Sequence, residues 1–283
     1  MKKELPQINE KNFPLISTHL TNFIREEVLR TGLKRVVLGL SGGIDSAVSC
    51  YLAEKALGKS NVTALLMPHR LSSPQSLKDA KNIVRLLGIG HHVIDITDGV
   101  DWYFTGEIKK GASEMDIKLR TGNKMARERM SILYDYSFKL KALVLGTSNK
   151  SELLLGYGTI FGDMASALNP IGDIYKTQIY QIARLLGVPE NIIKKAPTAD
   201  LWAGQSDESE LGFSYELADS IMYLLIDKMY KPEVLESLGY DIKIVNKIYG
   251  MIKKSQYKRR TPLIAKVSER TINVDFRYLR DWE

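Results

Sequence analysis

Residues 34–46, KRVVLGLSGGIDS, determine the fold that this sequence predicts. The first seven are rich in apolar and β-branched side chains, which is typical of a short buried strand. Two glycines follow, and residues 47–57, AVSCYLAEKAL, have the composition of a helix. A buried strand that leads through a glycine turn into a helix is the repeating unit of a parallel α/β sheet.

The same alternation continues on both sides of this unit. Apolar residues recur with a 3.6-residue period over 12–30, which indicates an amphipathic helix before the strand. Further strands are predicted at 61–68, 91–96 and 141–145, and further helices at 73–87, 126–140 and 173–186. This order predicts an α/β fold, a doubly wound parallel sheet flanked by helices and joined by right-handed crossovers.

No internal repeat or low-complexity linker divides the chain, so we expect one domain over 1–283. Its core would cover about 33–205, and C-terminal helices with a basic tail would cover 206–283. Residues 211–254 have a mostly helical pattern. Residues 111–124, GASEMDIKLRTGNK, are polar and show no period, which predicts a mobile loop.

Composition and charge narrow the classes of protein. No run approaches the roughly 18 apolar residues of a membrane span, and the N-terminus lacks the apolar run of a secretory signal. The one cysteine, Cys50, falls inside a predicted helix, so we expect a small core residue and a cytoplasmic location.

The four histidines show no metal-ligand spacing and are interpreted as structural. The net charge of +7 reflects either ordinary solubility or a polyanionic ligand such as a nucleotide or RNA.

The turn at 41–46, SGGIDS, is the strongest sign of a ligand site. Its glycines allow the backbone to approach a ligand, and its amides, with the start of the following helix, favour a bound phosphate. Ser41 and Ser46 add hydroxyl donors. The carboxylate of Asp45 would repel a phosphate, and it is explained if it binds Mg²⁺ that the phosphates also bind. The alternative is a flexible turn whose serine only caps the helix.

Two more polar clusters follow the last predicted strand. In a parallel sheet, ligands bind beyond the carboxyl ends of the strands, so these clusters and the 41–46 turn should face one crevice. Thr147 can donate to ATP and Glu152 can bind a metal, although Glu152 could also be a solvated helix carboxylate. Lys176 opens a predicted helix, where a lysine is unfavourable unless an anion lies nearby, or it is a plain surface lysine.

The turn SGGxDS resembles the pyrophosphatase loop of the N-type ATP pyrophosphatases. The wider set of motifs is similar to the NAD synthetase family, over about residues 35–260. These motifs are ARERM (126–130), GTSNKSE (146–152), YGTIFGD (157–163), NPIGDIYKT (169–177), PTADL (197–201) and QSDESELG (205–212). The resemblance implies a Rossmann-like fold of the adenine nucleotide alpha hydrolase type and ammonia-dependent amidation of deamido-NAD. It further implies ATP as co-substrate, Mg²⁺ as cofactor, and a homodimer with its active site near the interface, without a membrane or nucleic-acid partner.

The resemblance also assigns roles to individual residues. Asp45, Asp163 and Lys176 would be catalytic, and Asp45 and Glu152 would hold the metal. Residues expected to bind ATP are Gly39, Leu40, Ser41, Gly42, Gly43, Ile44, Asp45, Ser46, Thr147, Lys176 and Thr198. Residues expected to bind deamido-NAD are Arg127, Asp163, Tyr257 and Lys258, and Asp163 would lie beside the incoming ammonia.

Three positions depart from the family pattern. Tyr257 stands where many members carry histidine, Ile160 where some carry a substrate-binding lysine, and Ala167 where they carry aspartate. Glutamine-dependent members have an additional amidase domain with a catalytic cysteine, for which this chain is too short, so we expect free ammonia or a separate partner chain as the nitrogen source. Segments 111–124, 204–212 and 253–260 are candidates for a lid or are ordinary solvated loops.

Two other functions remain open at this point. A tRNA-modifying member of the same superfamily would explain the basic stretch over 253–260, although the zinc-binding cysteine pairs of such enzymes are absent from the sequence. A non-catalytic nucleotide sensor would bind ATP and release no pyrophosphate.

Overall fold

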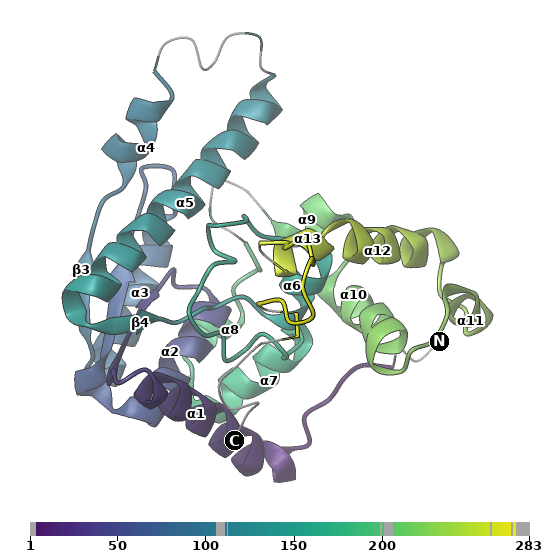
Figure 1. Ribbon diagram of the computed structural model, residues 1–283, viewed down its shortest axis with the longest axis horizontal. Coiled ribbons are helices and arrows are strands. Elements are labelled where there is room, and N and C mark those ends of the chain that lie inside the picture. The colour runs from purple at the N-terminus through teal and green to yellow at the C-terminus, as the bar shows by residue number, and fades with distance from the viewer. Residues whose placement is uncertain are drawn as a thin grey trace.

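A computed structural model describes residues 4–105, 111, 113–198, 200, 206–260, 262–272, 274 and 275. Over these ranges the chain forms the predicted α/β fold, a parallel sheet with helices against both faces (Figure 1). The strands are β1 (Arg35–Gly39), β2 (Val62–Leu66), β3 (Gly90–Val93) and β4 (Ala142–Val144). Their order across the sheet is β3-β2-β1-β4, and each neighbouring pair is parallel.

Helices follow the strands in the predicted alternation. The helices up to β4 are α1 (Phe13–Arg30), α2 (Ile44–Leu57), α3 (Pro74–Leu87), α4 (Thr97–Tyr103) and α5 (Glu114–Leu140), with 3-10 turns at Glu10–Asn12 and Lys59–Asn61. The helices after β4 are α6 (Lys150–Leu155), α7 (Lys176–Leu186), α8 (Glu190–Ile193), α9 (Asp207–Leu211), α10 (Tyr215–Met222), α11 (Pro232–Ser237), α12 (Ile242–Lys254) and α13 (Gln256–Arg259). A π-helical turn, Tyr223–Asp227, extends α10.

The sheet separates two apolar clusters, because successive side chains of a strand point to opposite faces. In β1, Val36 and Leu38 pack with α1, α2, α3 and α7, whereas Val37 packs with α4 and α5 on the other face. Cys50 is fully buried in the first cluster, as predicted for a core residue. Helices therefore cover both faces of the central strands β1 and β2, and the ends of these strands are where a polar ligand can approach them.

A third apolar cluster lies in the C-terminal helices. It joins α10 and α12 to Leu155 of α6 and Tyr175 before α7, so this layer packs directly on the segments that follow β4 (Figure 1). The division into a core over about 33–205 and a C-terminal part over 206–283 stays a prediction. No helix in the described ranges has the length and apolar character needed to cross a membrane.

The expectation of a loop over 111–124 was wrong from residue 114 onward. Helix α5 begins at Glu114, after a capping box in which Ser113 and Asp116 satisfy each other's backbone amides. Its first two turns are mostly exposed, and its fully buried face begins only at Gly122. A helix without a buried face has no apolar period to detect, which explains the error. Residue 112 lies outside the described residues.

Smaller differences concern element ends. Strand β3 ends at Val93, three residues before the predicted end, and both His91 and His92 are exposed because β3 is an edge strand. Helix α7 begins at Lys176, three residues after the predicted start. Of the three lid candidates, 111–124 is largely helical, 253–260 covers the end of α12 and α13, and 204–212 contains α9, with residues 204 and 205 outside the described ranges.

Candidate active site

A cavity of about 470 Å³ opens at the carboxyl ends of β1, β2 and β4. The chain passes from β1 through β2 to β3 on one side and returns to β4 on the other side of β1. This change of direction is the topological switch point at which open α/β sheets bind ligands. The turn after β1 and the segment after β4 therefore meet across one crevice, as the sequence analysis expected.

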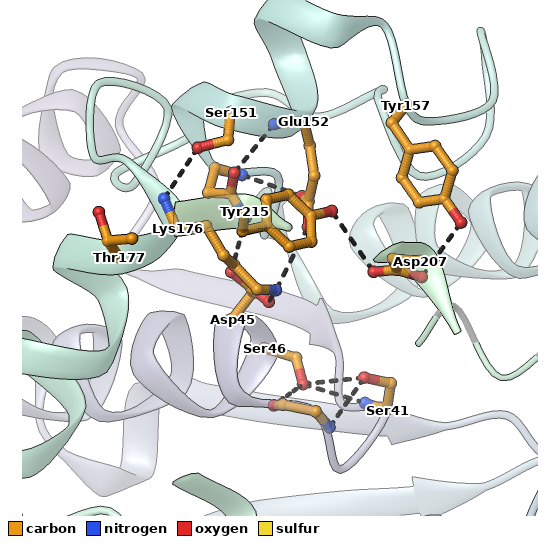
Figure 2. Close-up of polar contacts among 12 residues, drawn as sticks. Ser41, Asp45, Ser46, Ser151, Glu152, Tyr157, Lys176, Thr177, Asp207 and Tyr215 are labelled. Carbon is orange, nitrogen blue, oxygen red and sulfur yellow. Dashed lines mark hydrogen bonds and ion pairs between the residues drawn. The ribbon is translucent and has the colours of Figure 1, made fainter. Parts of the chain in front are cut away.

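The 41–46 turn is held by its own hydroxyl groups. Ser46 Oγ donates to the carbonyl of Gly43 at 2.9 Å and lies 3.1 Å from Ser41 Oγ, which accepts the amide of Gly43 at 3.2 Å (Figure 2). Gly43 is the N-cap of α2, a 14-residue helix whose positive dipole end adjoins the cavity. The turn is thus preorganised, with polar groups next to the start of a helix.

Gly42 is required by both its conformation and its surroundings. Its φ is +79°, a left-handed value, and a Cβ added there would lie 2.2 Å from the backbone oxygen of Ser76 in α3. The glycine thus allows the turn to pass against the first turn of a neighbouring helix.

Lys176 lies between two carboxylates at the centre of the site. Its Nζ is 2.5 Å from Asp45 Oδ2 and 3.6 Å from Glu152 Oε1 (Figure 2). Burial disfavours the charge of Lys176, but Asp45 and Glu152 outweigh it and raise the pKa of the lysine. Burial, together with the nearby Asp45, raises the pKa of Glu152. The lysine at the first position of α7 therefore has the anionic neighbours that the sequence analysis required.

Asn149 connects the two segments that carry these carboxylates. Its Nδ2 donates to Asp45 Oδ1 at 2.8 Å, while its Oδ1 accepts the amide of Glu152 at 2.9 Å. Glu152 in turn accepts the amide of Asn149, which completes a capping box at the start of α6. The pattern N-x-x-E could have revealed the cap, but the contact with Asp45 spans 104 residues and has no local signal.

The donor set around Asp45 and Glu152 fits a magnesium ion. Both provide hard carboxylate oxygens, and the ammonium of Lys176 lies between them where a cation is favoured. Among the described residues, no three or more His, Cys, Asp or Glu side chains form a group that could hold a metal ion. Magnesium characteristically uses one or two carboxylates and takes its other ligands from water and substrate phosphates.

Asp163 and Lys258 line the same cavity from other segments. The carboxylate of Asp163 accepts the amide of Thr159 at 2.9 Å, and the residue is exposed to the cavity. The surrounding protein keeps water away from the carboxylate of Asp163, and this desolvation raises its pKa. The hydrogen bond from Thr159 and the charge of Lys258 oppose the increase. Lys258 Nζ donates to the carbonyl oxygens of Gly156 and Gly158, both at 2.8 Å.

Most predicted site residues line this cavity, and some do not. Those that do are Gly39, Leu40, Ser41, Gly43, Asp45, Ser46, Thr147, Glu152, Asp163, Lys176, Thr198 and Lys258. Gly42 and Ile44 belong to the turn but are buried. Arg127 is exposed on α5 and donates to the carbonyl of Ile160, and the side chain of Tyr257 is half exposed; in the described part of the chain neither is among the lining residues.

The lining also contains polar residues to which the sequence analysis gave no role. Arg129 donates to the carbonyl of Met67 at 3.0 Å and lines the cavity, whereas Arg127, two positions earlier, is outside it. Asp207 accepts the hydroxyl of Tyr157 at 3.1 Å, and Figure 2 shows this pair beside Tyr215. Arg129 belongs to the quoted ARERM motif, but the motif alone does not tell which arginine faces the ligand.

Comparisons with known proteins agree with this geometry. A family model for NAD synthase matches residues 16–262. A relative from Trichlorobacter lovleyi named NH(3)-dependent NAD(+) synthetase is 51% identical over 271 residues, which cover 96% of this chain and 97% of the relative. One of the same name from Fusobacterium nucleatum is 50% identical over 256 residues, which cover 90% of this chain and 97% of the relative.

Two solved structures extend the comparison to the fold. The NH3-dependent NAD synthetase from Campylobacter jejuni, in complex with the nitrate ion, has a TM-score of 0.76 and 36% identity, and the match covers 92% of this chain and all of that one. The NMN synthetase from Francisella tularensis has a TM-score of 0.77 and 31% identity, with 92% and 99% covered. The fold, the site at the switch point and these relatives together establish that the chain belongs to the NAD synthase family.

Proposed function

We propose that this chain is an ammonia-dependent NAD synthetase, which uses ATP to amidate the nicotinate carboxylate of deamido-NAD and releases AMP and pyrophosphate. The observation that carries the proposal is one cavity that contains the 41–46 turn, the cluster of Asp45, Glu152 and Lys176, and the Asp163–Lys258 pair. The first two suit a triphosphate, and the third suits a carboxylate substrate with an incoming amine. The curated relatives, matched over nearly their full length, support the same activity.

The ATP triphosphate would lie across the 41–46 turn, against its hydroxyl groups and the N-terminus of α2. Lys176 is already held near Asp45 and Glu152, so little reorganisation is needed to place its charge beside the α-phosphate. Asp45 and Glu152 would hold Mg²⁺, which supplies charge neutralisation for the phosphates when bound. Thr147 and Thr198, both in the lining, can donate to the nucleotide.

The first step would form an acyl-adenylate. A carboxylate oxygen of the nicotinate attacks the α-phosphorus of ATP, the bond from that phosphorus to the bridging oxygen breaks, and pyrophosphate leaves. The protein holds the two reactants in line and stabilises the developing charge with Lys176 and the backbone amides of the turn. Lys176 and residues of the turn line the same cavity, which supports this assignment.

The second step would transfer nitrogen. At neutral pH ammonia is mostly ammonium, so a carboxylate at the point of entry both binds the cation and accepts its proton. We assign this role to Asp163, which lines the cavity and lies close enough to Lys258 for the lysine to influence its charge. Ammonia then attacks the carbonyl carbon, the added nitrogen loses a proton to solvent, and AMP leaves with the oxygen that the carboxylate contributed.

A homodimer with the active site near its interface forms part of this proposal. Helix α5 leaves Phe138 with 89% of its surface exposed, along with Tyr134, although it is the longest helix in the described chain. Arg127 lies on the same helix outside the cavity and could reach a substrate that extends to the partner.

We also propose a cytoplasmic location, for which the single, buried cysteine is the support.

A small set of assays separates this function from its rivals. Purified protein is given deamido-NAD, ATP and Mg²⁺ with either ammonium or glutamine, and NAD⁺ and pyrophosphate are measured. NAD⁺ formation with ammonium supports the proposal, whereas ATP binding without pyrophosphate release would indicate a sensor. Nicotinate mononucleotide replaces deamido-NAD in a parallel reaction, because one structural relative is named NMN synthetase. Retention of bulk tRNA on filters at physiological salt would indicate the tRNA-modifying alternative.

A further inference from the structure

Asp219 is a fully buried carboxylate that does not line the cavity among the described residues. Burying a carboxylate is costly unless hydrogen bonds satisfy it. Its Oδ1 accepts the hydroxyl of Ser151 at 2.5 Å, and its Oδ2 accepts the backbone amide of Thr177 at 2.8 Å. Both oxygens of Asp219 thus contact segments adjacent to the active site.

The two segments carry the residues proposed to act on the triphosphate. Ser151 immediately precedes Glu152 in α6, and Thr177 immediately follows Lys176 in α7. Ser151 Oγ also accepts the backbone amide of Lys176 at 2.9 Å (Figure 2). The first two amides of α7 have no partner within the helix, so Asp219 and Ser151 supply the hydrogen bonds that define where the helix begins.

Helix α10 also contacts the other end of Lys176. Tyr215 lies four residues before Asp219, on the same face of α10, and Lys176 Nζ is 5.3 Å from the centroid of its ring. The helix therefore approaches Lys176 at its backbone through Asp219 and at its ammonium through Tyr215.

We propose that Asp219 is a positioning residue of the adenylation site, which through Ser151 and Thr177 places the start of α7 so that Lys176 meets Asp45 and Glu152. The inference rests on the proposed function of Lys176 at the triphosphate. It assigns to a residue of the C-terminal helical layer a role in ATP binding and pyrophosphate release, beyond its role in packing.

The test uses Asp219→Asn, which keeps the shape of the side chain and replaces one acceptor oxygen with an amide donor. Ser220→Ala is the matched control, because Ser220 is the next residue of α10, is fully buried, and forms a hydrogen bond at 2.5 Å with Tyr240 of the C-terminal layer. Each variant is measured for melting temperature, for ATP affinity by calorimetry with Mg²⁺, and for the rate of pyrophosphate release. Ser151→Ala removes the hydroxyl that connects Asp219 to the amide of Lys176, and it replaces Asp219→Asn in the test if that variant does not fold.

Asp219→Asn should weaken ATP binding about tenfold and slow pyrophosphate release about 10- to 100-fold, as expected for a displaced reacting group. Ser220→Ala should lower the melting temperature, but it should leave the ATP affinity and the rate of pyrophosphate release within twofold of the unmodified protein. In a Lys176→Met background, Asp219→Asn should weaken ATP binding no further, because the group that it positions is gone. An equal loss of affinity in both backgrounds, or unchanged ATP affinity and pyrophosphate release in Asp219→Asn alone, would overturn the inference. Unchanged ATP affinity in Lys176→Met alone would instead refute the proposed function of Lys176, and this inference with it.

Discussion

Replacing Gly42 with alanine tests the structure of the phosphate turn quantitatively. An alanine at φ +79° costs about 1–2 kcal/mol for its left-handed conformation, of which about 0.4–1 kcal/mol is recovered through the reduced entropy of the unfolded chain. Its Cβ would also meet the Ser76 oxygen at 2.2 Å, an overlap that requires backbone movement and adds about 1–3 kcal/mol. The total is a sizeable part of the roughly 5–15 kcal/mol by which a domain is stable.

A comparison with Gly187→Ala isolates the cost of the overlap between the added Cβ and the Ser76 oxygen. Gly187 also has φ +79°, but in the described part of the chain no atom of a non-neighbouring residue lies within 4 Å of an added Cβ. The backbone cost is therefore shared, and the difference between the variants measures the overlap with Ser76. With about 2–4 °C per kcal/mol for a chain near this size, Gly42→Ala should melt about 2–12 °C below Gly187→Ala.

Calorimetry and ATP titration provide the two readouts. Gly42→Ala should weaken ATP binding, because relieving the overlap moves the turn that we propose to hold the triphosphate, whereas Gly187→Ala should bind ATP as the unmodified protein does. Equal melting temperatures for the two variants, with ATP binding intact in both, would refute the reasoning, since the turn would then tolerate a side chain against α3.

Other predictions address the chemistry and the core. Asp163→Asn should still release pyrophosphate but form NAD⁺ slowly, and equal slowing of both steps in a rapid-quench experiment would remove Asp163 from the ammonia step. Lys258→Ala should raise KM for deamido-NAD more than KM for ATP, whereas the reverse order in steady-state kinetics would place Lys258 with the nucleotide. Burial raises the pKa of Cys50 to about 12, so a thiol reagent should label it only after unfolding. Because the unfolded thiol ionises at lower pH, the stability that Cys50 contributes should fall as pH rises from about 9 toward 12, and denaturant titrations of Cys50→Ala should lack this part of the decline.

Local signals in the sequence were sufficient to predict the first strand–turn–helix unit of the fold. The strand, glycine turn and helix over 35–57 were predicted correctly because propensity, apolar pattern and turn chemistry agree there. Lys176 at the start of α7 was also identifiable, because a lysine is unfavourable at that position without a nearby anion. The anions proved to be Asp45 and Glu152, both residues that the sequence analysis had selected for the metal.

Contacts between distant segments could not be predicted in this way. Asp219 is 68 residues from Ser151 and 42 from Thr177, and nothing near it in the sequence distinguishes it from a surface carboxylate. The start of α5 was missed because a capping box initiates an exposed helix that has no apolar period. Tertiary contacts determine that Asp219 is buried, and solvent exposure hides the start of α5 from an analysis of apolar periodicity.

Isotope transfer from the substrate carboxylate tests the central claim most directly. Deamido-NAD labelled with ¹⁸O in the nicotinate carboxylate is converted with ATP and ammonium, and the AMP is analysed by mass spectrometry. Activation as an acyl-adenylate predicts one ¹⁸O atom in the phosphate of AMP, because the carboxylate oxygen stays on phosphorus when nitrogen replaces it. Unlabelled AMP, or label in inorganic phosphate or pyrophosphate, would contradict the account.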